Sequence, residues 1–184
     1  MEIQEWIVKN LNDDSVIIEA GAASGTDTLW FSQTFPKGRI FAFEPLTVSF
    51  NRTLERIANC DNVEVYNVAL GPTESTEELY VSSNKVSSSL LKPTGHIQFH
   101  PRVSFENKST VRTINLDNFL KDQQVEQVDL MWLDMQGYEH TVLSHSSETL
   151  SKTRYLYSEV SLKEMYANSV LYNEFKSWLK ERGF

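Results

Sequence analysis

The chain has 184 residues, which is enough for one domain with a substantial core and too few for two. Hydrophobic residues make up 40% and charged residues 23% of the chain, as in ordinary soluble globular proteins. The formal net charge of −8 and the lack of a basic run argue against a nucleic acid as the main substrate.

The chain carries a single cysteine, Cys60, which excludes an internal disulfide and a multi-cysteine metal site. No apolar run reaches the ~18 residues that a membrane span needs. Residues 1–10 include acids and lack the apolar region of a secretory signal. We therefore expect a cytoplasmic protein without a membrane partner. Composition leaves the oligomeric state open.

Apolar runs alternate with amphipathic segments in the first part of the chain. Residues 15–20 predict a strand, residues 27–35 a helix and residues 39–45 a second strand. A second helix is indicated by apolar residues at helical spacing: Val48, Phe50, Leu54 and Ile57. Residues 62–70 alternate and then turn apolar, as in a third strand.

Residues 73–109 show no clear period and are rich in Ser, Thr, Asn and Lys. Because a structureless loop of this length is unusual, we interpret the segment as a substrate-side excursion with one or two irregular strands. Its Ser-rich part, residues 81–91, is a candidate lid over the substrate. His96 and His100 have a spacing that suits metal ligation on a helix, but Gly95 and Pro101 argue against a helix there. No metal site is predicted.

The alternation resumes in the second half of the chain. Residues 110–120 predict a strand and a short helix, and residues 171–182 predict a final helix. Residues 128–134 and 154–161 are apolar runs, typical of parallel strands buried on both faces. The sequence therefore predicts a single α/β domain over residues 1–184, with a doubly wound, mostly parallel sheet. In such sheets, ligands bind beyond the carboxyl ends of the strands.

A turn with two glycines, Gly21 and Gly25, follows the first strand, and its spacing argues against phosphate ligands. A P-loop needs G-x-x-x-x-G-K-[ST], but here the glycines are one residue too close and Thr26-Asp27 replaces the lysine and hydroxyl. A dinucleotide fingerprint would place Ala23 and Thr26 at its second and third glycines. Ala23 would crowd a pyrophosphate, and Asp27 in the first helical turn would repel it.

S-adenosylmethionine carries no phosphate, and two acids of this chain suit it. Glu19, before the turn, can receive its ammonium, while Gly21 and Gly25 open the turn to the amino-acid end. Glu44, at the end of the second strand, can accept hydrogen bonds from the ribose diol. The spacing from Gly21 to Glu44 also suits the ribose of a dinucleotide. An NAD-dependent oxidoreductase or epimerase is therefore an alternative, and a non-catalytic nucleotide-binding module is another.

The chain resembles the FkbM family of S-adenosylmethionine-dependent methyltransferases in six segments that follow one another: "VIIEAGAASGTDT", "FAFEP", "NVALG", "LDNF", "VDLMWLDMQGYEHTVL" and "YLYSEVS". The resemblance covers residues 16–184, and its most specific blocks are "EAGAASG", "FEP" and "LDMQGYE". It implies a Rossmann-like class I methyltransferase fold and O-methylation of natural products or sugars.

The resemblance also implies roles for individual residues. Those assigned to the cofactor are Glu19, Gly21, Ala22, Ser24 and Gly25 at the amino-acid end, Glu44 and Pro45 at the ribose, Asn67 and Val68 near adenine, and Asp134 near the sulfonium. This chain departs from the family pattern where Ala23 replaces an asparagine and Trp132 replaces a lysine. It also stops at Phe184, where class I methyltransferases continue into a final antiparallel strand pair, so we expect that pair to be lacking.

Methyl transfer to a hydroxyl requires a base near the methyl group. Asp134 is the first candidate from its position, followed by Glu139, His140 and Glu159. Glu159 stands out because an unpaired carboxylate at the end of a buried strand is costly. The sequence thus predicts O-methylation of a hydroxyl on a sugar, glycan or natural product. An amine or carboxyl acceptor stays open.

Overall fold

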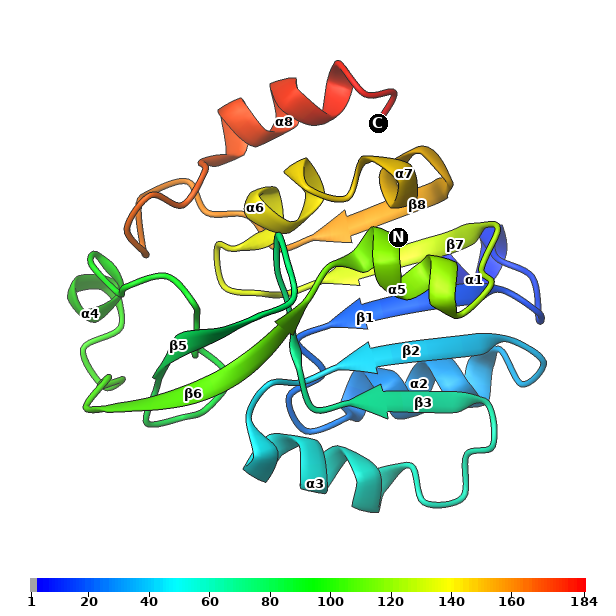
Figure 1. Ribbon diagram of the computed structural model, residues 1–184, viewed down its shortest axis with the longest axis horizontal. Helices are drawn as coiled ribbons and strands as arrows, with labels where there is room; N and C mark the ends of the chain where they lie inside the picture. The colour runs from blue at the N-terminus through cyan, green and yellow to red at the C-terminus, as the bar shows by residue number, and fades with distance from the viewer. Residues whose placement is uncertain (1–2) are drawn as a thin grey trace.

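The computed structural model describes residues 3–184 and contains a five-stranded sheet and a smaller three-stranded sheet (Figure 1). The larger sheet has the spatial order β3 (Val63–Tyr66), β2 (Arg39–Phe43), β1 (Val16–Ala20), β7 (Val128–Leu133) and β8 (Thr153–Ser158). The smaller sheet has the order β4 (Ala69–Leu70), β6 (Asn107–Ile114) and β5 (Ser75–Val81). Every pairing in the larger sheet is parallel, which confirms the predicted α/β sheet. Within residues 3–184, β8 is its last strand, at one edge.

Helices cover both faces of the larger sheet. The helices of the described residues are α1 (Ile3–Asn10), α2 (Thr26–Thr34), α3 (Thr47–Arg56), α4 (His96–Phe99), α5 (Leu116–Asp122), α6 (Glu139–Ser144), α7 (Ser147–Ser151) and α8 (Tyr172–Lys180), of which α4 lies beyond the sheet edge. Ile17 belongs to an apolar cluster that includes Ile7 of α1 and Phe31 of α2. Ile18 belongs to a second cluster on the other face, which includes Phe119 of α5. The alternation of side chains along β1 thus separates the core into two layers.

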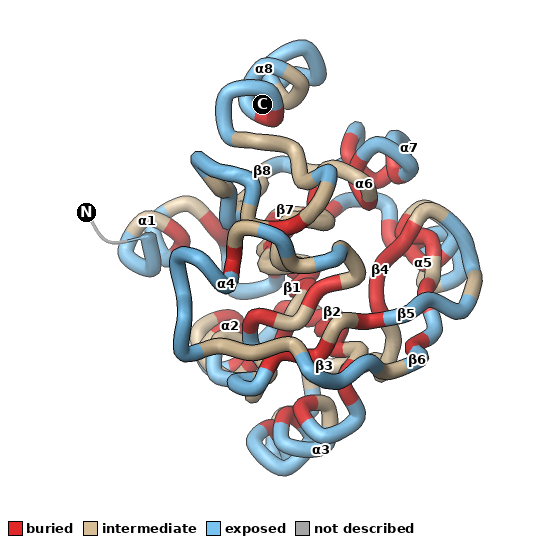
Figure 2. Tube along the Cα trace, turned by 90° about the vertical axis from the view of Figure 1, so that its left-hand side faces the viewer, coloured by how far each residue is buried: buried red, intermediate tan, exposed pale blue. Residues whose placement is uncertain are grey.

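The parallel strands end at one edge, and residues 73–109 lie beyond it. In Figure 1 the arrowheads of β1, β2 and β7 all point to this edge, with β5, β6 and α4 beyond it. Figure 2 looks onto the same edge: buried residues gather around the central strands, while the outer sides of α3 and α8 are exposed. Within residues 3–184, no helix combines the length and apolar character needed to cross a membrane.

Two predictions about local structure were wrong. Residues 62–70 form two strands, β3 and β4, that belong to different sheets. The chain breaks at Asn67 because its side-chain amide donates to the backbone oxygens of Glu44 (2.9 Å) and Pro45 (3.0 Å). A helix does form at His96–Phe99: Gly95 is its N-cap, and it ends before Pro101.

Helix α3 also differs from its apolar pattern. Val48 and Leu54 are 46% and 42% exposed, whereas Ser49 and Thr53 are buried. The Thr53 hydroxyl donates to the backbone oxygen of Ala23 at 3.2 Å. The helix therefore turns small polar side chains toward the turn after β1, and larger apolar ones toward solvent.

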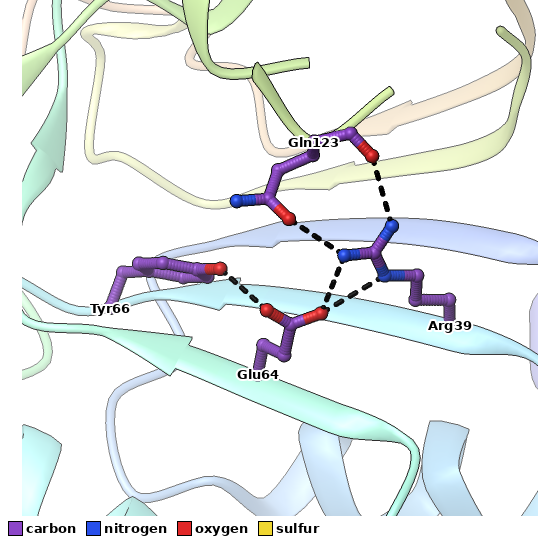
Figure 3. Close-up of polar contacts among 4 residues, drawn as sticks. All are labelled: Arg39, Glu64, Tyr66 and Gln123. Atoms are coloured by element: carbon purple, nitrogen blue, oxygen red, sulfur yellow. Dashed lines mark hydrogen bonds and ion pairs between the residues drawn. The ribbon is translucent and has the colours of Figure 1, made fainter. Parts of the chain in front are cut away.

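A polar network ties α5 to the start of the sheet (Figure 3). The Arg39 guanidinium donates to Glu64 Oε1 at 3.0 Å and to the backbone and side-chain oxygens of Gln123, just after α5. The Tyr66 hydroxyl donates to Glu64 Oε2 at 2.7 Å. Partial burial raises the pKa of Glu64, but the hydrogen bonds from Tyr66 and Arg39 outweigh it, and the net pKa is lowered. The carboxylate is therefore held in its charged form.

Candidate active site

The turn after β1 packs closely on the ends of β7 and α3. Gly21 has φ +91°, and a Cβ atom there would lie 1.9 Å from the backbone oxygen of Asp134. Gly25 has φ +72°, and a Cβ atom there would lie 2.8 Å from Cγ2 of Thr53. Both positions therefore require glycine, because positive φ and close contact together exclude a side chain.

Glu44 joins this turn to the turn after β2. Its Oε2 accepts the N–H of Ala23 at 2.8 Å, and its Oε1 accepts the N–H of Leu46 at 2.8 Å. Glu44 is 5% exposed. Burial raises its pKa to about 7, although the two N–H bonds oppose the shift. A carboxylate oxygen can accept more than one hydrogen bond, so both oxygens retain capacity for a ligand.

A first cavity, of about 180 Å³, opens beside this turn. Of the predicted cofactor residues, those that line it are Gly21, Ala22, Ser24, Glu44, Pro45, Val68 and Asp134. The prediction missed its apolar wall, which includes Phe43, Leu70 and Leu79, and also missed Met135 and Tyr138. Asp27 lines the cavity as well, and burial together with the nearby Asp134 raises the pKa of Asp27.

Three predicted cofactor residues, Glu19, Gly25 and Asn67, are not among those that line the first cavity. Glu19 is fully buried on the α2 side of β1, where its pKa is raised to about 8, chiefly by burial. The nearby Thr28 lowers this pKa, and the Oε2 atom of Glu19 has no hydrogen-bond partner among the described residues. Glu19 therefore lies behind the turn and does not line the first cavity. Gly25 and Asn67 shape the turns that border the cavity.

A second cavity, of about 420 Å³, lies next to the first. Asp134 and Val86 line both cavities, so the two meet at these side chains. All four predicted candidates for the base line the second cavity: Asp134, Glu139, His140 and Glu159. The structure thus brings these four residues together.

Gln136 connects two of the acids and is absent from the predicted site. Its Nε2 donates to Asp134 Oδ1 at 2.6 Å and to Glu159 Oε2 at 2.8 Å. Burial raises the pKa of Asp134, the hydrogen bond from Gln136 lowers it, and the charge of Glu159 raises it; the net shift is upward. Gln136 has φ +54°, in the sparsely populated left-handed region. The backbone at this position is therefore shaped to present the amide to both carboxyl groups.

Glu139 and His140 have structural contacts of their own. Glu139 Oε1 accepts the N–H of Met135 at 2.7 Å, and burial raises the pKa of Glu139 to about 7. The His140 ring lies edge-on to Trp178 of α8, with ring centres 4.8 Å apart, and burial lowers its pKa. Glu139 stabilises the loop that carries Asp134, while His140 anchors α8.

Residues 81–91 separate the two cavities. Lys85, Ser88 and Leu90 line the first cavity, Asn84 and Ser87 the second, and Val86 both. Ser89 fixes this segment to the loop that carries Asp134 and Gln136, because its hydroxyl donates to the backbone oxygen of Gln136 at 2.9 Å.

The excursion also contributes a histidine to the second cavity. His96 is 4% exposed, and its Nδ1 has no hydrogen-bond partner among the described residues. Its ring centre lies 4.7 Å from that of His100. Across residues 3–184, no group of three or more His, Cys, Asp or Glu side chains is arranged to hold a metal ion.

Comparison with known proteins agrees with this geometry. The family model described as the Methyltransferase FkbM domain matches residues 19–184. The 2-O-methyltransferase NoeI of Sinorhizobium fredii is 31% identical, over 90% of this chain and 72% of NoeI. The hexuronic acid methyltransferase AglP of Haloferax volcanii is 21% identical, over 86% of this chain and 61% of AglP. The chain therefore spans only part of the length of these relatives.

Among solved structures, a chain of the fibrillarin/Nop5p complex superimposes with a TM-score of 0.51 at 17% identity. The match covers 94% of this chain and 62% of that one, and it shows a shared fold. The family match sets aside the NAD-dependent alternative and the non-catalytic alternative. The chain belongs to the FkbM family of S-adenosylmethionine-dependent methyltransferases.

Proposed function

We propose that this domain transfers a methyl group from S-adenosylmethionine to a hydroxyl group of a sugar or a sugar-bearing small molecule. The observation that carries the proposal is the position of Asp134, which lines both cavities. A donor in the first cavity and an acceptor in the second would meet at its carboxyl group. The names of the relatives NoeI and AglP, a 2-O-methyltransferase and a hexuronic acid methyltransferase, support an oxygen acceptor on a sugar.

The first cavity offers groups that match the parts of the cofactor. The spare lone pairs of Glu44 suit the ribose diol, and the carboxyl groups of Asp27 and Asp134 suit the ammonium. Val68 and Leu70 offer apolar surface for adenine. When bound, the cofactor supplies an electrophilic methyl group.

The size of the first cavity implies a movement on binding. Its volume of about 180 Å³ is small beside the roughly 300–1,000 Å³ of typical small-molecule sites. Residues 81–91 form one wall, and Val86 is 58% exposed. We therefore expect this segment to withdraw as the cofactor enters and to close over it afterwards, in the manner of an active-site lid.

Asp134 is the proposed base. Its carboxylate would take the proton of the acceptor hydroxyl while the hydroxyl oxygen bonds to the methyl carbon. The methyl–sulfur bond would break at the same time, with its electron pair staying on the sulfur of S-adenosylhomocysteine. Because the pKa of Asp134 is raised, its carboxylate binds a proton more readily than an ordinary aspartate does. Gln136 keeps Asp134 and Glu159 at fixed positions, so that the base is aligned before the acceptor arrives.

The test has a binding step and a product step. Calorimetry should show binding of S-adenosylhomocysteine and no comparable binding of NAD. Mass spectrometry of reactions with methyl-labelled S-adenosylmethionine and a panel of glycosides should then find a labelled methyl ether. Tight binding of NAD without a response to S-adenosylhomocysteine would contradict the proposal. So would a labelled product that carries its methyl group on nitrogen.

We further infer a cytoplasmic location and an acceptor other than a nucleic acid. The net charge of −8 supports the second inference, since a phosphate backbone would be repelled. The single cysteine, which is free in the structure, is compatible with a reducing compartment. Filter binding to RNA and DNA at low salt would test the acceptor class, with no retention expected.

A further inference from the structure

The second cavity is lined by acidic side chains and by no lysine or arginine among the described residues. Three carboxyl groups, those of Asp134, Glu139 and Glu159, line it. The whole chain adds a net charge of −8 in the background. An anionic ligand would therefore find no ion-pair partner there.

Two histidines of the cavity favour their uncharged form. Burial and the neighbouring His100 lower the pKa of His96, and burial lowers the pKa of His140. His100 lines the cavity as well, with its ring centre 4.7 Å from that of His96. The amide of Gln136 and the hydroxyl of Tyr166 add neutral polar groups.

The cavity nevertheless has unused hydrogen-bonding capacity. The carboxyl groups of Asp134 and Glu159, which line it, have lone pairs that can accept further hydrogen bonds. A ligand with several hydroxyl groups could donate to them. The rings of Tyr166 and Phe175 add flat apolar surface to the same cavity. The volume of about 420 Å³ lies within the usual range for small-molecule sites, roughly 300–1,000 Å³.

We propose that the second cavity accepts a polyhydroxylated sugar ring without an anionic group, and that its three carboxyl groups reject sugars that carry a carboxylate. This inference rests on the proposed function, because it takes the second cavity as the acceptor site. The proposed acceptor differs from the one that the name of the relative AglP indicates, since AglP is named a hexuronic acid methyltransferase. The physical basis is that a carboxylate entering the cavity would lose water without gaining an ion-pair partner, and any of the three acids that is ionised would repel it.

Methionine methyl groups provide separate reporters for the two cavities. Met135 lines the first cavity and Met165 lines the second, while Met131 is fully buried in the core. In protein labelled with ¹³C at the methionine methyls, S-adenosylhomocysteine should shift the Met135 signal. Methyl hexopyranosides added to that complex should then shift Met165, and Met131 should not move with either.

The comparison that decides the proposal is a matched pair of sugars. A methyl hexopyranoside and the methyl glycoside of the corresponding hexuronic acid are titrated while Met165 is followed. We expect the neutral sugar to bind at least about tenfold more tightly. Equal or tighter binding of the hexuronide would overturn the inference, and so would a Met165 signal that responds to neither series. Loss of the Met135 response alone would instead count against the proposed cofactor site.

A charge variant gives an independent check. Ser161 lines the second cavity, and Ser161→Lys would add a cation there. It should reduce the preference for the neutral sugar severalfold. Ser177→Lys, on the exposed side of α8, adds the same charge away from the cavity and should leave the preference unchanged. The inference fails if both variants behave alike.

Discussion

The hydroxyl of Tyr166 donates a hydrogen bond to Oε1 of Gln136 at 2.9 Å. The amide nitrogen of Gln136 faces Asp134 and Glu159, and its oxygen faces Tyr166. The same hydroxyl lies 2.8 Å from the backbone oxygen of Ser87, in the segment between the cavities. Tyr166 therefore positions the acid pair through Gln136, without a hydrogen bond of its own to either acid.

Removing this hydroxyl should slow the reaction without affecting the cofactor. We expect Tyr166→Phe to lower kcat by about 3- to 10-fold, the worth of one hydrogen bond, and to leave S-adenosylhomocysteine affinity unchanged. Because the bond from Gln136 lowers the pKa of Asp134, a looser Gln136 should move the rise of the pH–rate profile to higher pH. Tyr172→Phe on α8 is the matched control. If Tyr166→Phe has the same pH–rate profile and the same kcat as the unaltered protein, the Tyr166 hydroxyl does not position the acids and the ring contributes packing alone.

Asp134→Asn keeps the shape of the side chain and removes the base. We expect kcat to fall by about 10²- to 10⁴-fold, as for the loss of a general base. In the unaltered protein kcat should rise with pH as Asp134 loses its proton, over a range above that of an ordinary aspartate because its pKa is raised. The residual rate of the variant should lack this rise. A variant with near-normal kcat would assign the base elsewhere, with Glu159 tested next.

Glu44 should contribute mainly to cofactor affinity. Its carboxylate lines the first cavity and holds the N–H groups of Ala23 and Leu46. Glu44→Ala should weaken S-adenosylhomocysteine binding by about 1–3 kcal/mol, measured by calorimetry. Glu55→Ala, on the exposed side of α3, is the control for a lost carboxylate. An affinity unchanged by Glu44→Ala would remove this residue from the site.

Glu19 should make the free protein less stable as the pH rises. Its pKa in the folded state is about 8, so the folded protein keeps a proton that the unfolded chain releases near pH 4.5. The contribution of protonated Glu19 to the free energy of unfolding is complete below about pH 4.5 and is lost as the pH rises through about 8. Glu19→Gln should unfold with a smaller pH dependence and be more stable at pH 9, by on the order of a few kcal/mol. Urea denaturation measures the free energy of unfolding of both proteins at pH 5 and pH 9. The same change with pH in Glu19→Gln and in the unaltered protein would contradict this account.

Residues 81–91 should respond to the cofactor. They form a wall of the first cavity, which must enlarge to hold S-adenosylmethionine. Hydrogen exchange should show faster exchange of these amides in the free protein and protection after S-adenosylhomocysteine is added. Strand β8 lies away from the cavity and serves as an internal reference. Equal exchange in both states would show that the cofactor enters without movement of this segment.

The fold could be predicted where burial leaves a clear pattern. Strands β1 and β7 are apolar runs because central parallel strands are covered on both faces, and the glycine turn marks the start of α2. The expectation that β8 is buried on both faces was wrong, since it lies at the sheet edge and none of its residues is buried. Helix α1 was not predicted, although Ile7 is fully buried. Helix α3 was predicted from Val48, Phe50, Leu54 and Ile57. Ile57 is buried, but Val48 and Leu54 are exposed, and Ser49 and Thr53 face inward, where the turn at Gly25 packs closely on Thr53.

The roles of the site residues stay predictions, but their positions can be compared with the cavities. Strand ends pointed to Glu44, Asp134 and Glu159, all of which line a cavity, whereas the bridging contacts of Gln136 depend on a left-handed backbone that the sequence does not reveal. Strand alternation indicates which face of the sheet Glu19 takes. It lies one residue from both Ile18 and Ala20, whose side chains pack on the opposite face of the sheet.

The most direct test of the central claim is methyl transfer itself, measured with a labelled methyl donor on neutral glycosides. The account predicts a labelled methyl ether made by the unaltered protein. It also predicts Asp134→Asn to bind S-adenosylhomocysteine yet form product at least about 10²-fold more slowly. A protein that binds S-adenosylhomocysteine and methylates an acceptor at the same rate with and without the Asp134 carboxylate would contradict it.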